Sequence, residues 1–149
     1  MWHKFIQSNL AVFAALLLAA LSSYFPVING TFLFDDEFFI EKNETVRDFQ
    51  VKKIYTTGVT QGANVGGNFY RPNQQLVFAV IYKVFGLNST PFHLFSILCH
   101  CLVAFLLFLF LAELNFSRTG SFVGSLIFLL HPVQTEAVSY ISGLADPLS

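Results

Sequence analysis

Two long runs without charged side chains dominate the hydrophobic pattern of this chain. No Asp, Glu, Lys or Arg occurs in residues 5–34 or in residues 84–112. A helix needs about 20 apolar residues to cross the hydrocarbon core of a bilayer, and each run is longer than that. The pattern therefore predicts spanning helices at about residues 5–25 and 92–112.

A third uncharged run, residues 119–135, is weaker than the first two. Its apolar part covers only residues 122–130 and is followed by His131-Pro132. Because proline lacks the backbone N–H and collides with the preceding turn, a helix should end or kink there. We predict a third segment at about residues 120–131, which is either a short span or a re-entrant element.

The first run has a second interpretation. Lys4, the apolar residues 11–21 and the small residues near 19–23 also fit a cleavable signal peptide. The uncharged run continues past any such cleavage site, which favours a membrane anchor. Either interpretation sends the following segment to the same side of the membrane.

Most of the charged residues lie between the first two predicted spans, in a loop at about residues 26–91. This loop holds six of the eight basic residues and six of the nine acidic ones. Within it, residues 76–85 are apolar except for Lys83, and this run is too short to span a bilayer. We predict an interfacial amphipathic helix here, with Lys83 reaching toward lipid headgroups and with Phe78, Tyr82 and Phe85 in the lipid boundary.

The composition fits a membrane environment. Of the 149 residues, 54% are hydrophobic and 11% are charged, which leaves too few polar groups to cover a water-soluble surface. The net charge of −1 gives no indication of a nucleic-acid partner. The expected fold class is an all-α membrane protein with two to three transmembrane helices, for which the lipid bilayer is a partner.

Three consecutive carboxylates, Asp35, Asp36 and Glu37, follow the first predicted span and lie among aromatic residues. Crowded carboxylates beside apolar rings resist ionisation, which is a property of working general bases. The alternative is a solvated acidic turn at the membrane surface. Adjacent residues point in different directions, so not all three can serve one site.

A second group of candidates, His131, Glu136 and Asp146, lies at and beyond the end of the third run. A histidine and carboxylates at a membrane boundary are costly unless they face a polar cavity or a partner. The alternative is a polar helix end in the headgroup layer. After three alternating spans, this segment and the first loop face the same compartment and could form one cleft.

Four blocks of residues carry a resemblance to a known family. They are Phe34-Asp35-Asp36 with Phe39-Ile40 and Asn43; Tyr70-Arg71-Pro72; Phe92-His93 leading to His100; and His131-Pro132 with Thr135-Glu136-Ala137-Val138, Gly143, Ala145 and Asp146. In this order they resemble the C-type superfamily of integral-membrane glycosyltransferases. Within it, they are most similar to the transmembrane and tetratricopeptide-repeat O-mannosyltransferases and their bacterial relatives.

This resemblance implies a multi-span helical fold whose first loop is extracytoplasmic and carries the catalytic acid. The implied donor is a polyprenyl- or dolichyl-phosphate sugar, and the implied acceptor is a protein or glycan hydroxyl. The residues carried over are Asp35 or Asp36 as the catalytic residue, and Arg71, His131, Glu136 and Asp146 as residues that bind substrate. One position departs from the family pattern: Leu144 stands where arginine is frequent, so a donor-phosphate contact is missing or comes from elsewhere.

The residues suit an inverting transfer. One carboxylate would take the proton of the acceptor hydroxyl as it attacks the anomeric carbon, and Arg71 would hold the departing lipid phosphate. The leaving group is a monophosphate, so no cofactor is required, although the acidic pair could bind a divalent metal ion.

Three helices are too few to enclose both a lipid-linked donor and an acceptor. The chain is therefore expected to be the N-terminal portion of a larger membrane domain and to be inactive alone, in a bacterial inner membrane or the endoplasmic reticulum membrane. The alternative is a nonenzymatic membrane scaffold or transporter fragment, in which the acidic loop is only surface. Further spans and an array of helical repeats of about 34 residues downstream would favour the enzyme.

Overall fold

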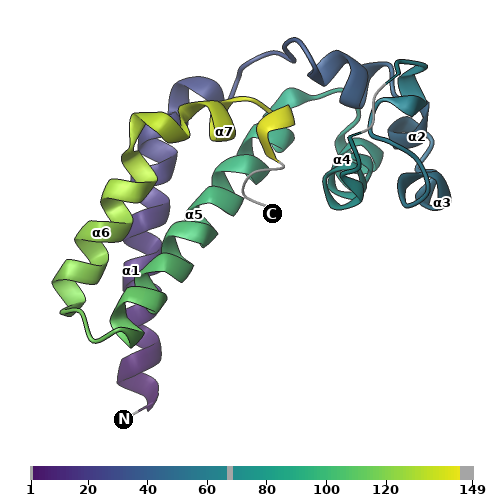
Figure 1. The fold of residues 1–149 in the computed structure, drawn as a ribbon. Helices are drawn as coiled ribbons and strands as arrows, with labels where there is room; N and C mark the ends of the chain where they lie inside the picture. The colour runs from purple at the N-terminus through teal and green to yellow at the C-terminus, as the bar shows by residue number, and fades with distance from the viewer. Residues whose placement is uncertain (1, 67–68, 145–149) are drawn as a thin grey trace.

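The computed structural model describes residues 2–66 and 69–144 and contains helices and no strands in that part of the chain. One part of the molecule is a bundle of three helices, and the other is a smaller lobe formed by the first loop (Figure 1). The bundle consists of α1 (Trp2–Tyr24), α5 (Ser89–Glu113) and α6 (Arg118–Leu130). The lobe contains α2 (Glu44–Arg47), α3 (Val51–Ile54) and α4 (Pro72–Phe85).

Two helices of the bundle are long and apolar enough to cross a membrane, and they agree with the two predicted spans. These are Asn9–Val27, which lies mostly in α1, and Ser89–Glu113, which is α5. Helix α6 is apolar but has only 13 residues, a length of about 20 Å. It runs antiparallel to α5 after a short link, so the predicted third segment is a helix shorter than an ordinary span (Figure 1).

Small and apolar side chains hold the bundle together. Ala20 of α1, Cys101 and Ala104 of α5 and Leu129 of α6 are fully buried in one cluster. The outward faces of the same helices are apolar as well, with exposed leucine and phenylalanine side chains. Helices that are apolar on every face suit a lipid environment better than water.

The carbonyl of Leu129 joins the three helices near the end of α6. The helix ends directly before His131, as predicted, and the N–H of Val133 donates to Nδ1 of His131 at 3.2 Å instead of continuing the helix. The Leu129 carbonyl accepts a hydrogen bond from the Tyr24 hydroxyl at 3.3 Å, and Nε2 of His100 lies 3.2 Å from it. A polar group left over at a helix end is thus satisfied inside the bundle.

The lobe is organised around Asn43, which is fully buried. Its side-chain oxygen accepts from the N–H of Val46 at the start of α2, and its amide donates to the carbonyl of Val59 at 2.7 Å. Gln75 of α4 donates to the same Val59 carbonyl at 2.9 Å. These bonds fold the loop back onto α4.

Helix α4 differs from its prediction in extent and in orientation. It begins at Pro72 rather than near residue 76. Phe78 is only 1% exposed and packs on Phe92 of α5 with ring centroids 5.8 Å apart, so its predicted place in the lipid boundary is wrong. Nζ of Lys83 lies 4.5 Å from the centroid of the Phe49 ring within the lobe. The interfacial location of α4 stays a prediction, and its exposed apolar residues are Val80, Val84 and Phe85.

Candidate functional site

Asp36 is buried and connects the first loop to the segment after α6. It is 1% exposed, and its Oδ1 accepts the N–H of Ser142 at 2.8 Å. Its Oδ2 accepts the N–H of Leu33 at 3.0 Å. Burial raises the pKa of Asp36 above its usual value. The hydrogen bonds from the two backbone N–H groups lower the pKa, and the negative charge of Asp35 raises it. Both carboxylate oxygens are therefore used inside the fold.

Asp35 lies in the opposite environment, although it is the adjacent residue. Its side chain is exposed and makes no hydrogen bond or ion pair with the described part of the chain. Its backbone carbonyl accepts the N–H groups of Phe38 and Phe39 at 3.0 and 2.9 Å, which anchors the residue at the start of a helical turn, Glu37–Glu41. The backbone of Asp35 is thus held in place, while its carboxylate is exposed and open to a ligand.

The segment after α6 runs across the end of the bundle toward the start of α5 (Figure 1). It contains a 3-10 turn (Pro132–Gln134), helix α7 (Thr135–Ser139) and a second 3-10 turn (Ser142–Leu144). Besides the bond to Asp36, the carbonyl of Ser142 accepts a hydrogen bond from Nε2 of Gln74 at 2.7 Å. The two candidate segments are therefore in contact, as the alternating spans predict.

Gly143 allows this segment its close turn. A Cβ atom at this position would lie 2.9 Å from the carbonyl oxygen of Glu136 and 3.1 Å from Cα of Ala137. Such distances are shorter than side chains tolerate, so the backbone of the second turn approaches α7 only because residue 143 is glycine. This gives a physical reason for one residue of the fourth block.

Tyr140 belongs to the site but was not among the residues predicted from the sequence. Its ring stacks on Phe34 with centroids 5.9 Å apart and planes 16° apart. Desolvation raises the pKa of Tyr140, and the negative charges of Asp36, Asp35 and Glu136 raise it further. The phenol is therefore within the electrostatic influence of carboxylates from both segments. Its place within the fourth block, between Glu136 and Gly143, was the available signal in the sequence.

Three of the remaining predicted residues lie in the described part of the chain. Arg71 precedes α4, is half-buried, and its guanidinium carbon lies 5.6 Å from the centroid of the Phe69 ring. His131 is exposed at the end of α6, and Glu136 is exposed in the first turn of α7. Asp146 lies outside the described residues. The substrate-binding roles of all four stay predictions.

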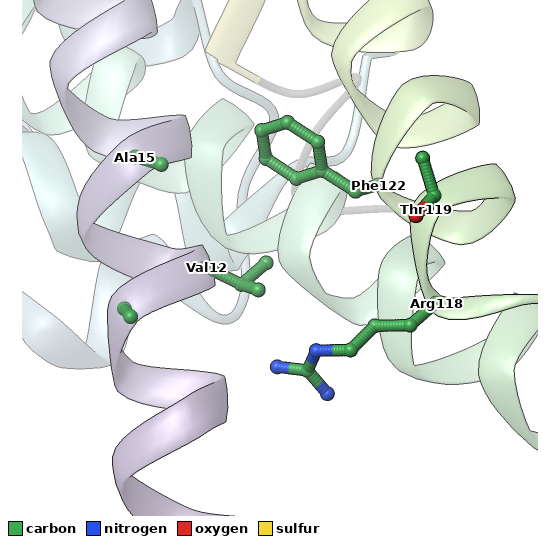
Figure 2. Close-up of a pocket in the computed structure, with 6 residues that line it drawn as sticks. Val12, Ala15, Arg118, Thr119 and Phe122 are labelled. Carbon is green, nitrogen blue, oxygen red and sulfur yellow. The ribbon is translucent and has the colours of Figure 1, made fainter.

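A cavity of about 440 Å³ lies elsewhere, between α1 and α6 (Figure 2). It is lined by Ala11, Val12, Ala15, Arg118, Thr119 and Phe122. The guanidinium of Arg118 donates a hydrogen bond to Asn9 at 3.1 Å. This is the end of the bundle opposite the carboxylates (Figure 1). In residues 2–66 and 69–144, no group of three His, Cys, Asp or Glu is placed to hold a metal ion.

Comparison with known proteins identifies similar sequences. The human protein O-mannosyl-transferase TMTC1 is 35% identical over 144 residues, which cover 91% of this chain and 16% of that protein. The Drosophila melanogaster Tmtc1 protein is 28% identical over 146 residues, which cover 94% of this chain and 17% of that protein. The chain is a homologue of the TMTC proteins.

Further TMTC relatives match over similar lengths. Human TMTC3 is 27% identical over 145 residues, which cover 95% of this chain and 16% of that protein. The chain thus spans only about one sixth of the length of the TMTC proteins that it matches. No family model and no solved structure matches the chain. The resemblance to TMTC O-mannosyltransferases is confirmed, while its extension to bacterial relatives and to the C-type superfamily stays a prediction.

Proposed function

We propose that this chain carries the catalytic carboxylate of a glycosyltransferase that uses a polyprenyl- or dolichyl-phosphate sugar. The names of its TMTC homologues support mannose as the sugar and a protein hydroxyl as the acceptor. The observation that carries the proposal is the contrast between Asp35, which is exposed, and Asp36, which is buried with both oxygens hydrogen-bonded. Asp36 uses both of its carboxylate oxygens to hold the loop, which leaves the exposed carboxylate of Asp35 available to react.

Asp35 is the general base in this proposal. Its carboxylate takes the proton of the acceptor hydroxyl while the acceptor oxygen bonds to the anomeric carbon of the sugar. The bond between that carbon and the phosphate oxygen breaks, and its electron pair leaves with the lipid phosphate. Asp36 is unsuited to this step because its oxygens already accept two backbone N–H groups.

Arg71 is the candidate for holding the lipid phosphate. It precedes the first turn of α4, and Gln74, one turn further on, reaches Ser142 beside Asp36. The N-terminal end of a helix also carries partial positive charge, which adds to the guanidinium charge. Positive charge at this edge of the site would stabilise the phosphate as it leaves.

The proposed location follows from the long apolar helices. With α1 and α5 across the membrane, the first loop and the segment after α6 lie on one side, which we propose to be the lumenal or extracytoplasmic side. The exposed residues Val80 and Val84 would place α4 at the membrane surface. A donor whose lipid stays in the bilayer would then present its sugar to Asp35.

The test uses the full-length protein, meaning the encoded protein with whatever follows residue 149. Purified protein is given a serine- and threonine-containing acceptor peptide and either dolichyl-phosphate mannose or GDP-mannose. Transfer is expected from the lipid donor only. Arg71→Ala should raise the KM for that donor by about 10-fold or more, because hydrogen bonds to charged groups contribute about 1.5–3 kcal/mol. Arg71→Lys should be less affected, since it keeps the charge.

Two results would contradict the proposal. Direct transfer from GDP-mannose by the purified protein would exclude a required lipid-phosphate donor. Parent-like donor KM in Arg71→Ala, in a protein that transfers sugar, would remove Arg71 from phosphate binding.

A further inference from the structure

We propose that the rings of Phe34 and Tyr140 form the surface against which the sugar ring of the donor lies, beside Asp35. This inference rests on the proposed function and extends it to the residues that recognise the sugar. It is carried by the strained backbone of Phe34, its exposure, its stacking on Tyr140 and the carboxylates around the ring pair.

The conformation of Phe34 is unfavourable and brings no burial in return. Its φ angle is +48°, in the left-handed region that side chains with a Cβ atom rarely adopt. The residue is 76% exposed, although it is large and apolar. Residues held in such conformations cluster at functional sites, where the surrounding structure imposes them. Stability of the fold does not explain why a phenylalanine stands here.

The surrounding hydrogen bonds hold this conformation. The carboxylate of Asp36 accepts the N–H of Leu33, the residue before Phe34, at 3.0 Å. The carbonyl of Phe34 accepts the N–H of Glu37 at 3.3 Å. The ring is therefore directed onto Tyr140, and the same turn sets the position of Asp35.

The ring pair joins the two segments of the candidate site. Phe34 comes from the first loop and Tyr140 from the residues after α7, and the rings lie nearly parallel at 5.9 Å. Phe34 keeps most of its surface open despite this contact. Phe34 directly precedes Asp35 in the chain. The sugar has to lie close to the proposed base, because the base acts on a hydroxyl in contact with the anomeric carbon.

The polar groups at the edge of the pair favour a sugar ring over other ligands. A pyranose has apolar C–H groups on its faces and hydroxyl groups around its edge, so it needs a flat apolar surface bordered by hydrogen-bonding groups. The carboxylates of Asp35 and Glu136 are exposed, their charges act on Tyr140, and each is able to accept hydrogen bonds from a ligand. Burial and these neighbouring charges raise the pKa of Tyr140, so its hydroxyl remains a donor.

The same charges argue against other occupants of the ring pair. An acyl chain or an apolar peptide side chain would form no hydrogen bonds with the carboxylates of Asp35 and Glu136. The donor phosphate would be repelled by them, which places it away from the rings and toward Arg71. The sugar is the part of the donor that the Phe34–Tyr140 pair fits.

The experiment measures how much the sugar adds to donor binding. Full-length protein in lipid nanodiscs is titrated with dolichyl-phosphate mannose and with dolichyl phosphate, which lacks the sugar. The parent protein should bind the sugar-bearing lipid more tightly. Phe34→Ala and Tyr140→Ala should each reduce that preference by about 3- to 10-fold, the range of an aromatic stacking contact. Tyr140→Phe, which keeps the stack and loses one hydroxyl, should lose less.

Two further variants control for folding. Phe116→Ala removes another exposed phenylalanine, 57% exposed in the link between α5 and α6, and should leave the preference unchanged. Phe34→Gly removes the ring while accepting a positive φ angle without strain. The Phe34→Gly variant should therefore have an unfolding temperature equal to or above that of the parent protein, and it should still lose the preference for the mannose-bearing lipid.

The outcomes separate this inference from the proposed function. If the parent protein prefers the mannosyl lipid and both alanine variants keep that preference, the ring pair does not bind the sugar, and the proposed function stands. If the variants change the KM for the acceptor peptide instead, the rings hold the acceptor and the inference is wrong. If the parent protein binds neither lipid, the donor in the proposed function is wrong and this inference falls with it.

Discussion

Asp35 and Asp36 are adjacent in the sequence but lie in opposite environments. The sequence indicated a general base in this pair and could not separate the two residues. The difference arises from the N–H of Ser142, which lies 106 positions away in the chain and binds Asp36. Contacts over such a distance have no local pattern, so the assignment of Asp35 as the exposed partner needed the structure.

The burial of Asp36 predicts a dependence of stability on pH. Because burial raises its pKa in the fold, the folded protein keeps this proton to a higher pH than the unfolded chain does. The resulting stabilisation is complete below the ordinary value of 3.8 and is lost as the pH rises through the raised value in the fold. Asp36→Asn cannot ionise and should lack this decline. Unfolding temperatures of both proteins from about pH 4 to pH 8 test this, and parallel curves would contradict it.

Gly143 gives a second prediction at this scale. An added methyl group in Gly143→Ala would press on the backbone of Glu136 and Ala137, so the variant should lose about 1–3 kcal/mol of stability. Gly66→Ala is the matched control, because a Cβ there has no atom within 4 Å. The check is the unfolding temperature of each variant. Equal effects at the two positions would show that the close turn at Gly143 is unimportant.

At the scale of elements, the long helices and helix α4 were predictable, and the rest of the lobe was not. The length of the two uncharged runs was sufficient to predict α1 and α5, and Pro132 indicated where α6 ends. The short helices α2 and α3 were missed, because four-residue helices depend on tertiary bonds such as those of Asn43. Phe78 was misplaced because an apolar residue suits a lipid boundary and a protein core equally well.

The arrangement of helices predicts which segments share a side of the membrane. In full-length protein with Cys99 and Cys101 replaced by alanine, single cysteines are introduced at the exposed positions Gln61, Val133 and Phe116. An impermeant maleimide should label the first two from one side and the third from the other, since α5 and α6 run antiparallel. Labelling of Gln61 and Val133 from opposite sides would be incompatible with the contact between Asp36 and Ser142.

At the scale of the whole molecule, the candidate site lies at one end of the helix bundle. The bundle exposes apolar faces, and the cavity beside Arg118 lies at the end away from the carboxylates. The TMTC homologues are about six times longer than the matched region, so most of their structure has no counterpart here. The expectation that these 149 residues alone do not transfer sugar stays a prediction.

The most direct test of the account is the turnover of Asp35→Asn in the full-length protein. This change keeps the size of the side chain and removes its ability to accept a proton, so kcat for mannose transfer should fall by about 10²- to 10⁴-fold. The KM for dolichyl-phosphate mannose and the unfolding temperature should stay close to those of the parent. Asp36→Asn should retain far more turnover, because it affects the fold rather than the chemistry. Parent-like turnover in Asp35→Asn would show that Asp35 is not the base and would contradict the account.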